Sequence, residues 1–106
     1  MRDAAELARV FKVLSTPARI RIVQLLRRRG LCVGALSHHL GVTQGAVSQH
    51  LRVLRDAGLV CPERRGYFIH YTVNEATLAR WKEITAGLFD IGAEAGDPSP
   101  RQQESP

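Results

Sequence analysis

The chain has 106 residues, of which 15 are Lys or Arg and 10 are Asp or Glu, giving a formal net charge of +5. This length suits one domain, no apolar run approaches the roughly 20 residues of a membrane-spanning helix, and two cysteines are too few for a disulfide framework. We therefore expect a cytoplasmic protein with free thiols and no membrane contact. Residues 1–92 carry 14 basic and 7 acidic residues, a balance that favours nucleic acid as a partner.

The N-terminal third predicts two helices and a short strand. Apolar residues at helical spacing predict a first helix over about residues 3–14. Thr16 followed by Pro17 predicts the start of a second helix, which we expect to end in three arginines, at 27–29, with Gly30 as its C-cap glycine. Residues 31–33 are too few for a helix and predict a short strand.

Residues 36–60 have the pattern of a helix-turn-helix. A first apolar stripe ends at Leu40, Gly41 interrupts it, and a second stripe begins at Val47. Thr43 is a suitable N-cap for the second helix, and Gly58 suits a left-handed C-terminal cap. The two helices are therefore expected to share one core.

The outer face of this second helix is short and mostly uncharged. At 100° per residue, the side opposite the apolar stripe carries Gly45, Ser48, Gln49, Arg52 and Asp56. Small residues and amides allow close approach to base edges and can hydrogen-bond to them. A glycine in a helix costs about 1 kcal/mol, and close passage of a phosphate or base would explain it at position 45.

The remaining sequence predicts a hairpin, a final helix and a tail. Residues 59–63 and 67–73 predict two strands around a turn at 64–66, and Pro62 fits only an edge strand. Asn74 is expected to cap a last helix that extends to Ile91. We expect one domain over 1–92 and a disordered tail over 93–106. The fold class is mainly α with a small β-hairpin wing, a winged helix-turn-helix in the order α-α-β-α-α-β-β-α.

Four segments together resemble the ArsR/SmtB family of bacterial repressors: LSTPARIRIVQLL at 14–26, LCVGAL at 31–36, LGVTQGAVSQHLRVLRDAGLV at 40–60 and RRGYFIHYTV at 64–73. The resemblance implies a homodimer joined through its first and last helices. Each subunit would place residues 44–52 in the major groove of a double-stranded inverted-repeat operator and its wing against the backbone or minor groove. The implied dimer residues are Leu7, Phe11, Leu78, Trp81 and Leu88.

The resemblance also assigns roles along the second helix of the motif. Ser48 and Gln49 are the candidates for base contact, and Arg52 is the candidate for phosphate contact. His50 flanks the apolar stripe, so a half-buried structural histidine and a DNA contact both remain open. The expected DNA-binding residues are Thr43, Gln44, Gly45, Ser48, Gln49, His50, Arg52, Arg64 and Arg65, with a solvated turn as the alternative for the last two.

A sensor site of the familiar kind is incomplete. Family members often release DNA when a metal or metalloid binds, commonly at a pattern such as ELCVCDL. This chain has GLCVGAL, in which Cys32 matches the first thiol while Gly34 and Ala35 replace the second thiol and the acid. The other familiar site, with histidines on the last helix, has no counterpart because no histidine follows His70.

The two cysteines leave alternatives open. If the short strand pairs with the second wing strand, His70 lies near Cys32 and Cys61 lies one strand farther away. A Cys32, Cys61 and His70 cluster could then bind a thiophilic metal or metalloid effector or act as a thiol-redox switch, although a disulfide between the cysteines would be strained. The alternative is that both are small buried apolar residues. No cofactor is certain.

The leading function is a sequence-specific DNA-binding transcriptional regulator, a homodimeric repressor of the ArsR type. The alternative is a winged-helix protein-interaction module without sequence-specific DNA binding. An enzyme is not expected, because the only nucleophile and base at hand, Cys32 and His38, have no acid nearby to orient them.

Overall fold

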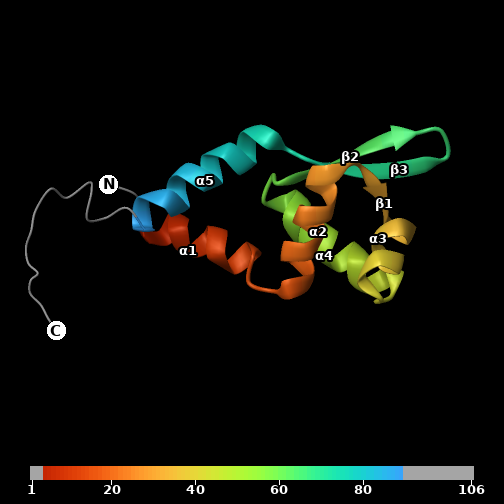
Figure 1. Cartoon of the computed structure of the whole chain (residues 1–106), viewed down its shortest axis with the longest axis horizontal. Helices are drawn as coiled ribbons and strands as arrows, with labels where there is room; N and C mark the ends of the chain where they lie inside the picture. The colour runs from red at the N-terminus through yellow and green to blue at the C-terminus, as the bar shows by residue number, and fades with distance from the viewer. Residues whose placement is uncertain (1–3, 90–106) are drawn as a thin grey trace, which may run out of the picture.

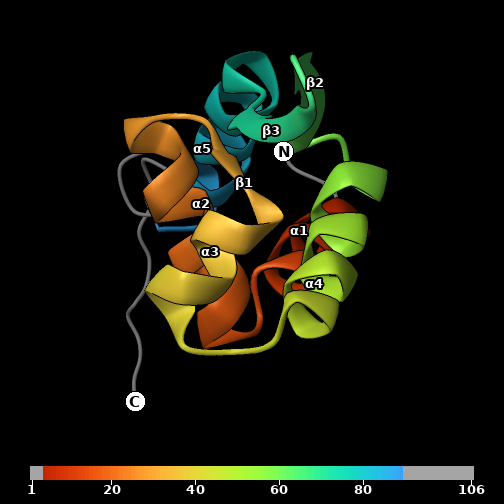
Figure 2. The ribbon, with the colours of Figure 1, turned by 90° about the vertical axis from the view of Figure 1, so that its right-hand side faces the viewer.

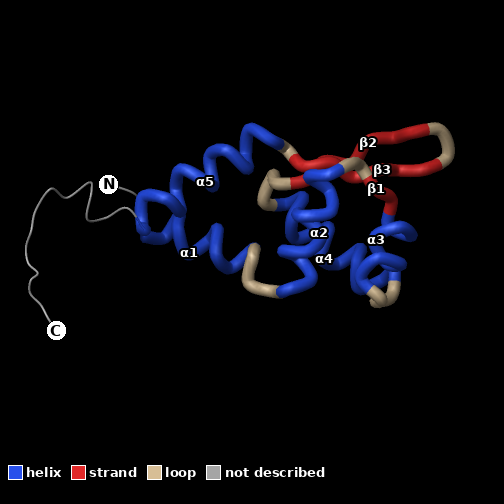
Figure 3. The backbone as a smooth tube through the Cα atoms, in the orientation of Figure 1, coloured by secondary structure: helices blue, strands red, loops and turns tan. Residues whose placement is uncertain are grey.

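The computed structural model describes residues 4–89; the predicted tail and the predicted helical end at Ile91 lie outside the described residues. Eight elements follow one another: α1 (Ala4–Val13), α2 (Pro17–Arg28), β1 (Leu31–Cys32), α3 (Val33–Leu40), α4 (Gln44–Asp56), β2 (Val60–Arg65), β3 (Phe68–Val73) and α5 (Glu75–Phe89). This order is the predicted one, and the arrangement is a winged helix-turn-helix (Figure 3).

The molecule is elongated, measuring 58 × 25 × 22 Å, with α1 and α5 side by side at one end (Figure 1). At the other end a three-stranded antiparallel sheet, in the order β1-β3-β2, extends into the wing. The wing strand β2 is therefore an edge strand, as Pro62 predicted. In the view of Figure 2, α3 and α4 lie below the sheet. None of the described helices is long and apolar enough to cross a membrane.

One hydrophobic core joins the helix-turn-helix to the sheet. Ile22 of α2, Leu36 of α3 and Leu54 of α4 have no exposed surface, and Leu59 before the wing is equally buried. Each fully buried aliphatic side chain contributes about 1.5–3 kcal/mol relative to an exposed one. No polar or charged residue among those described is buried, so apolar packing holds the helices together.

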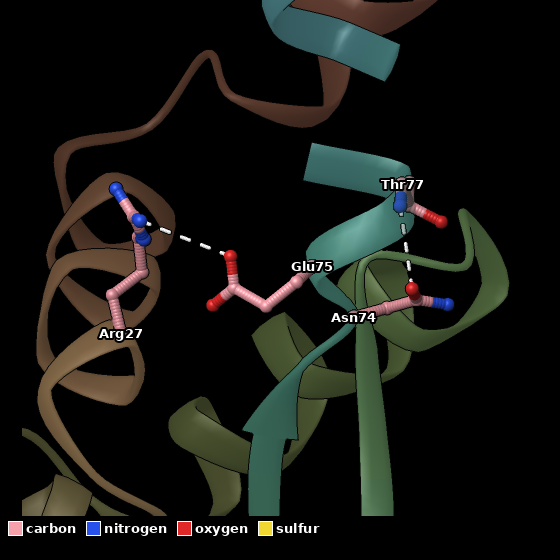
Figure 4. A network of polar contacts seen from close by, with 4 residues as sticks. All are labelled: Arg27, Asn74, Glu75 and Thr77. Carbon is pink, nitrogen blue, oxygen red and sulfur yellow. Dashed lines mark hydrogen bonds and ion pairs between the residues drawn. The ribbon is translucent and has the colours of Figure 1, made fainter. Parts of the chain in front are cut away.

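Three helices begin with the same kind of cap, in which a side-chain oxygen accepts a hydrogen bond from the backbone N–H three residues later. Thr16 Oγ1 accepts a hydrogen bond from the backbone N–H of Arg19 over 3.1 Å, and Thr43 Oγ1 accepts one from Ala46 over 3.1 Å. Asn74 Oδ1 accepts one from the backbone N–H of Thr77 over 3.2 Å (Figure 4). Each bond satisfies an amide that the helix itself leaves without an acceptor. The predicted starts of α2, α4 and α5 are confirmed.

The predicted glycine cap of α2 is wrong, whereas that of α4 is right. Gly58 has φ +79°, and the backbone N–H of Leu59 donates to the carbonyl of Leu54 over 2.9 Å, the geometry of a left-handed cap. The C-cap of α2 is instead Arg29, in extended conformation, and Gly30 packs closely on β3. A Cβ at Gly30 would lie 3.1 Å from Thr72 Cγ2, so α2 and β3 approach closely here and a side chain at position 30 would require a small shift.

The turn of the wing lies slightly later than predicted. Arg64 and Arg65 belong to β2, opposite Ile69 and Phe68, and are not in the turn. The two-residue loop consists of Gly66, with φ +63°, and Tyr67. A positive φ at the first position of a two-residue loop is typical of the type I′ and II′ turns, whose twist matches that of the strands. Because Gly66 has the left-handed conformation, it lies in the loop, and β2 continues up to Arg65.

The end of α2 is also tied to the start of α5. The guanidinium of Arg27 lies 3.8 Å from the carboxylate of Glu75, next to the Asn74 cap (Figure 4). Both side chains are more than half exposed, so the pair contributes little to stability. The contact shows that the last turn of α2 lies beside the junction between the wing and α5.

Candidate nucleic-acid interface

Helix α4 has a buried side and an exposed side, as its sequence predicted. Val47, Leu51 and Leu54 are at most 2% exposed and pack in the core. The exposed side carries the five predicted outer residues, all of which are accessible: Gly45, Ser48, Gln49, Arg52 and Asp56. Helix α4 can therefore enter a major groove with the Ser48 hydroxyl, the Gln49 amide and the Arg52 guanidinium facing the DNA.

The turn before α4 orients its first residues. Gly41 has φ +68° and ends α3, and its backbone N–H donates to the carbonyl of Ser37 over 2.9 Å. The hydroxyl oxygen of Thr43 is engaged as the cap of α4. Gln44 is exposed at the first position of the helix, and its Nε2 lies near Gly34, 3.7 Å from where a Cβ would stand. The start of α4 thus lies against the start of α3.

His50 lies at the edge of the exposed side and contacts α2. Its Nδ1 is 3.2 Å from a guanidinium nitrogen of Arg19, and the ring is half-buried. Arginine has no acceptor, so Nδ1 accepts this bond and the neutral ring carries its proton on Nε2. Burial lowers the pKa of His50, and the nearby charge of Arg19 lowers that pKa further.

The wing presents cations and aromatic residues together. Arg65 lies 3.3 Å from Glu63 on the same strand, and Arg64 donates to the carbonyl of Gly66 over 3.5 Å. Tyr67 at the tip is 98% exposed and Phe68 is 63% exposed. Such a tip can contact a phosphate backbone or the adjacent groove.

The structure brings Cys32 and His70 together and keeps Cys61 apart. Cys32 is the strand partner of His70, whereas Cys61 is on β2 and is the partner of Thr72. Both cysteines are free thiols; Cys32 is half-buried and Cys61 is exposed. Within residues 4–89, no three His, Cys, Asp or Glu side chains are arranged to hold a metal ion. The idea that both cysteines are buried is wrong for Cys61, which lies on the edge strand.

The predicted dimer residues differ in exposure. Leu78 and Trp81 are half-buried and pack against the core, and Leu7 is also half-buried. Phe11 on α1 and Leu88 on α5 are each 42% exposed, and Phe89 is 75% exposed. The two helices are joined by an ion pair of 3.1 Å between Glu6 and Arg80. Apolar surface therefore remains uncovered at the α1/α5 end of the chain.

Sequence reasoning missed two residues in this region. Arg19 is half-buried between α1, α2 and α4, and its partner His50 is 31 positions away, so no local spacing could reveal the contact. The other is Tyr67, which was assigned to a strand face but lies in the exposed loop of the wing. The positive φ required of Gly66 is the signal that could have placed it there.

Known proteins resemble this chain in sequence and in fold. A family model described as "Bacterial regulatory protein, arsR family" matches residues 16–61. The transcriptional repressor SdpR of Bacillus subtilis (strain 168) is 33% identical over 69 residues, which cover 65% of this chain and 77% of SdpR.

Two solved structures have a similar fold. A possible transcriptional regulator for arsenical resistance superposes with a TM-score of 0.70 at 32% identity, covering 86% of this chain and 97% of that chain. The homodimeric winged helix-turn-helix DNA-binding domain of a possible ArsR-family regulator from Mycobacterium bovis gives a TM-score of 0.65 at 25% identity, with 92% and 89% covered.

Proposed function

Because the chain belongs to the ArsR family of DNA-binding transcriptional regulators, we propose that it is a homodimeric repressor that binds an inverted-repeat operator. The proposal rests above all on α4. One side of this helix is buried in the core, and the other side exposes Gly45, Ser48, Gln49 and Arg52. The proposal places the site of action on double-stranded DNA in the cytoplasm.

The residues in the first part of the exposed side of α4 have roles that follow from their chemistry. Ser48 and Gln49 hydrogen-bond to base edges, since a hydroxyl and an amide can pair with donors and acceptors there. Arg52, one turn later, contacts phosphate. Gln44 and the capping Thr43 lie at the positive end of the helix dipole, which favours a nearby phosphate, and Gly45 lets the backbone approach closely.

The wing supplies a second contact. Arg64 and Arg65 bind phosphates beside the groove that α4 occupies, and Tyr67 lies against the sugar-phosphate surface. Contacts to the backbone carry no sequence information but set the register of the protein on the duplex. Sequence selectivity is therefore assigned to α4 and salt-dependent affinity to both elements.

Dimerisation follows from the uncovered surface of α1 and α5. Phe11 of α1 and Leu88 and Phe89 of α5 are exposed apolar side chains, and α1 and α5 lie side by side at the end away from the wing (Figure 1). A second copy would cover these side chains. The SdpR relative is a repressor and the Mycobacterium bovis neighbour is homodimeric, which supports the same assignment here. Two-fold symmetry then requires half-sites about one helical turn apart, roughly 34–36 Å.

Selection from a random duplex library, followed by affinity measurements on the enriched sequence, tests this function. We expect an inverted repeat, and a loss of about tenfold or more for Ser48→Ala combined with Gln49→Ala, because each lost base contact removes discrimination. Gln24→Ala on the exposed side of α2 is the matched control and should bind as wild type does. Equal affinity of the double variant and wild type would favour the protein-interaction module instead.

A further inference from the structure

Arg19 connects three helices through one guanidinium group. Its Nε donates to the carbonyl of Val13 over 2.6 Å, and Nη2 donates to the carbonyl of Lys12 over 3.4 Å, both at the end of α1. Its Nη1 contacts Nδ1 of His50, in the middle of α4, over 3.2 Å. The backbone of Arg19 is held in turn by the Thr16 cap at the start of α2.

These contacts fit the chemistry of an arginine. The last carbonyls of α1 have no partner within the helix, and a cation near them also interacts favourably with the negative end of the helix dipole. The guanidinium is planar and its donors point in fixed directions, so it can bond the end of α1 and the ring on α4 in only a narrow range of orientations. Lysine could not form the same set of contacts.

The apolar core decides which side of α4 is buried, but it supplies no directional contact that fixes the exact rotation of the helix. Val47, Leu51 and Leu54 are aliphatic, and the hydrophobic effect that buries them is non-directional. A hydrogen bond depends on distance and angle, so the bond at His50 restricts rotation of α4 about its own axis. His50 directly follows Ser48 and Gln49 in the helix, and any rotation there moves both residues relative to a groove.

We propose that Arg19 and His50 form a positioning pair that fixes the rotation of α4 relative to α1, one of the two helices proposed to form the dimer. The pair thereby sets the direction in which the base-reading side chains of each subunit point. This inference rests on the proposed function, because aiming matters only if α4 reads bases. In this proposal His50 contacts Arg19 of α2 and does not contact DNA. Arg19, outside every DNA-contacting element, is then a determinant of operator selectivity.

The test compares two replacements of His50 in the full-length protein. His50→Leu is of similar size but has no acceptor, whereas the carbonyl oxygen of His50→Asn stands near the place of Nδ1 and can accept from Arg19. Affinities are measured for the selected operator and for a scrambled duplex of the same length, and the salt dependence is recorded. Sedimentation velocity and thermal unfolding show whether each variant remains a folded dimer.

We expect His50→Leu to lower operator affinity about tenfold or more and scrambled-duplex affinity hardly at all, with an unchanged salt slope, because no phosphate contact is lost. His50→Asn should recover most of the operator affinity. Arg19→Gln should resemble His50→Leu, and the matched control Arg21→Gln, at an exposed position of α2, should resemble wild type.

Each of four results would overturn the proposal. One is operator affinity of His50→Leu equal to wild type; another is a folded His50→Asn dimer as weak as His50→Leu, which would indicate that the ring itself contacts DNA. The third needs no DNA: nitrogen NMR of the neutral His50 ring should show the proton on Nε2, and a proton on Nδ1 would contradict the contact. A wild-type protein that does not distinguish operator from scrambled duplex would overturn the proposed function as well.

Discussion

Cys32 lies directly opposite His70 in the antiparallel pair of β1 and β3, while Cys61 lies on β2, beyond β3. Two strand spacings separate the cysteines, roughly 9.6 Å from neighbouring strands about 4.8 Å apart. A disulfide requires Cα atoms within about 7 Å. The sheet order therefore prevents a bridge between Cys32 and Cys61 within one folded chain.

Mild oxidation should accordingly leave the monomer without an internal disulfide. We expect thiol titration to find both cysteines reactive, with Cys61 labelled faster than Cys32 because Cys61 is exposed and Cys32 half-buried. Mass spectrometry of the oxidised, non-reduced protein provides the measurement, with Cys61→Ser as control. A Cys32–Cys61 linkage at high yield in the folded monomer would contradict the strand order.

Gly45 is expected to cost stability in exchange for close approach to DNA. Only Thr43 Oγ1, at 3.9 Å, lies near a Cβ added there, so Gly45→Ala should fit the free protein and raise its free energy of unfolding by about 0.5–1 kcal/mol. The same methyl group should weaken operator binding. Denaturant unfolding and DNA affinity are measured together.

Gly34→Ala is the control for the helix-stability effect alone, because Gly34 is likewise the second residue of its helix and an added Cβ would lie 3.7 Å from Gln44 Nε2 and 4.0 Å from Cys32 Sγ. It should gain a similar free energy of unfolding. If Gly45→Ala binds DNA as tightly as wild type, the glycine does not serve close approach.

Stability should fall in mild acid because of His50. Burial, and then the charge of Arg19, lowers the pKa of His50 in the folded protein, whereas the unfolded chain has the ordinary value of about 6.5. Below that pH the unfolded state binds more protons than the folded state, so the contribution of His50 is complete above about pH 6.5 and is lost as the pH falls toward the lower folded pKa.

Denaturant midpoints measured from pH 7.5 to 5 check this dependence against His50→Asn, which cannot titrate and should show a shallower decline. His39→Asn, at an exposed site on α3, is the control and should follow wild type. Parallel curves for wild type and His50→Asn would show that other groups cause the decline.

The negative charge of Glu63 should weaken the binding of the wing to DNA. In the free protein this carboxylate lies 3.3 Å from Arg65, where it competes with a phosphate and adds a repulsive charge. Glu63→Gln should therefore strengthen DNA binding, whereas Arg64→Gln should weaken it. Removing one phosphate contact per subunit lowers the slope of log affinity against log salt by about 0.9 for each contact.

Fluorescence anisotropy over a range of salt concentrations gives both quantities. Glu75→Gln, at the start of α5, removes an acid outside the wing and serves as control for net charge alone. An unchanged salt slope in Arg64→Gln would mean that the wing does not contact the backbone.

The main features of the fold could be predicted because their signals are local. Thr16, Thr43 and Asn74 each bond an amide three residues later, and Gly58 adopts the left-handed conformation that a side chain would strain. The outer side of α4 followed from helical spacing, since a stripe of buried aliphatic residues leaves the opposite residues exposed. These properties depend on neighbours within one or two turns of the chain.

Tertiary structure decided the rest. Gly30 has the sequence context of a helix cap, but packing of α2 on β3 uses it for close approach to Thr72. The separation of Cys32 from Cys61 depends on strand order, and the contact between Arg19 and His50 joins residues 31 positions apart. The sequence alone determined which face of α4 is free to meet DNA. Only packing between distant segments decided how that face is held, because directional contacts across elements have no period along the chain.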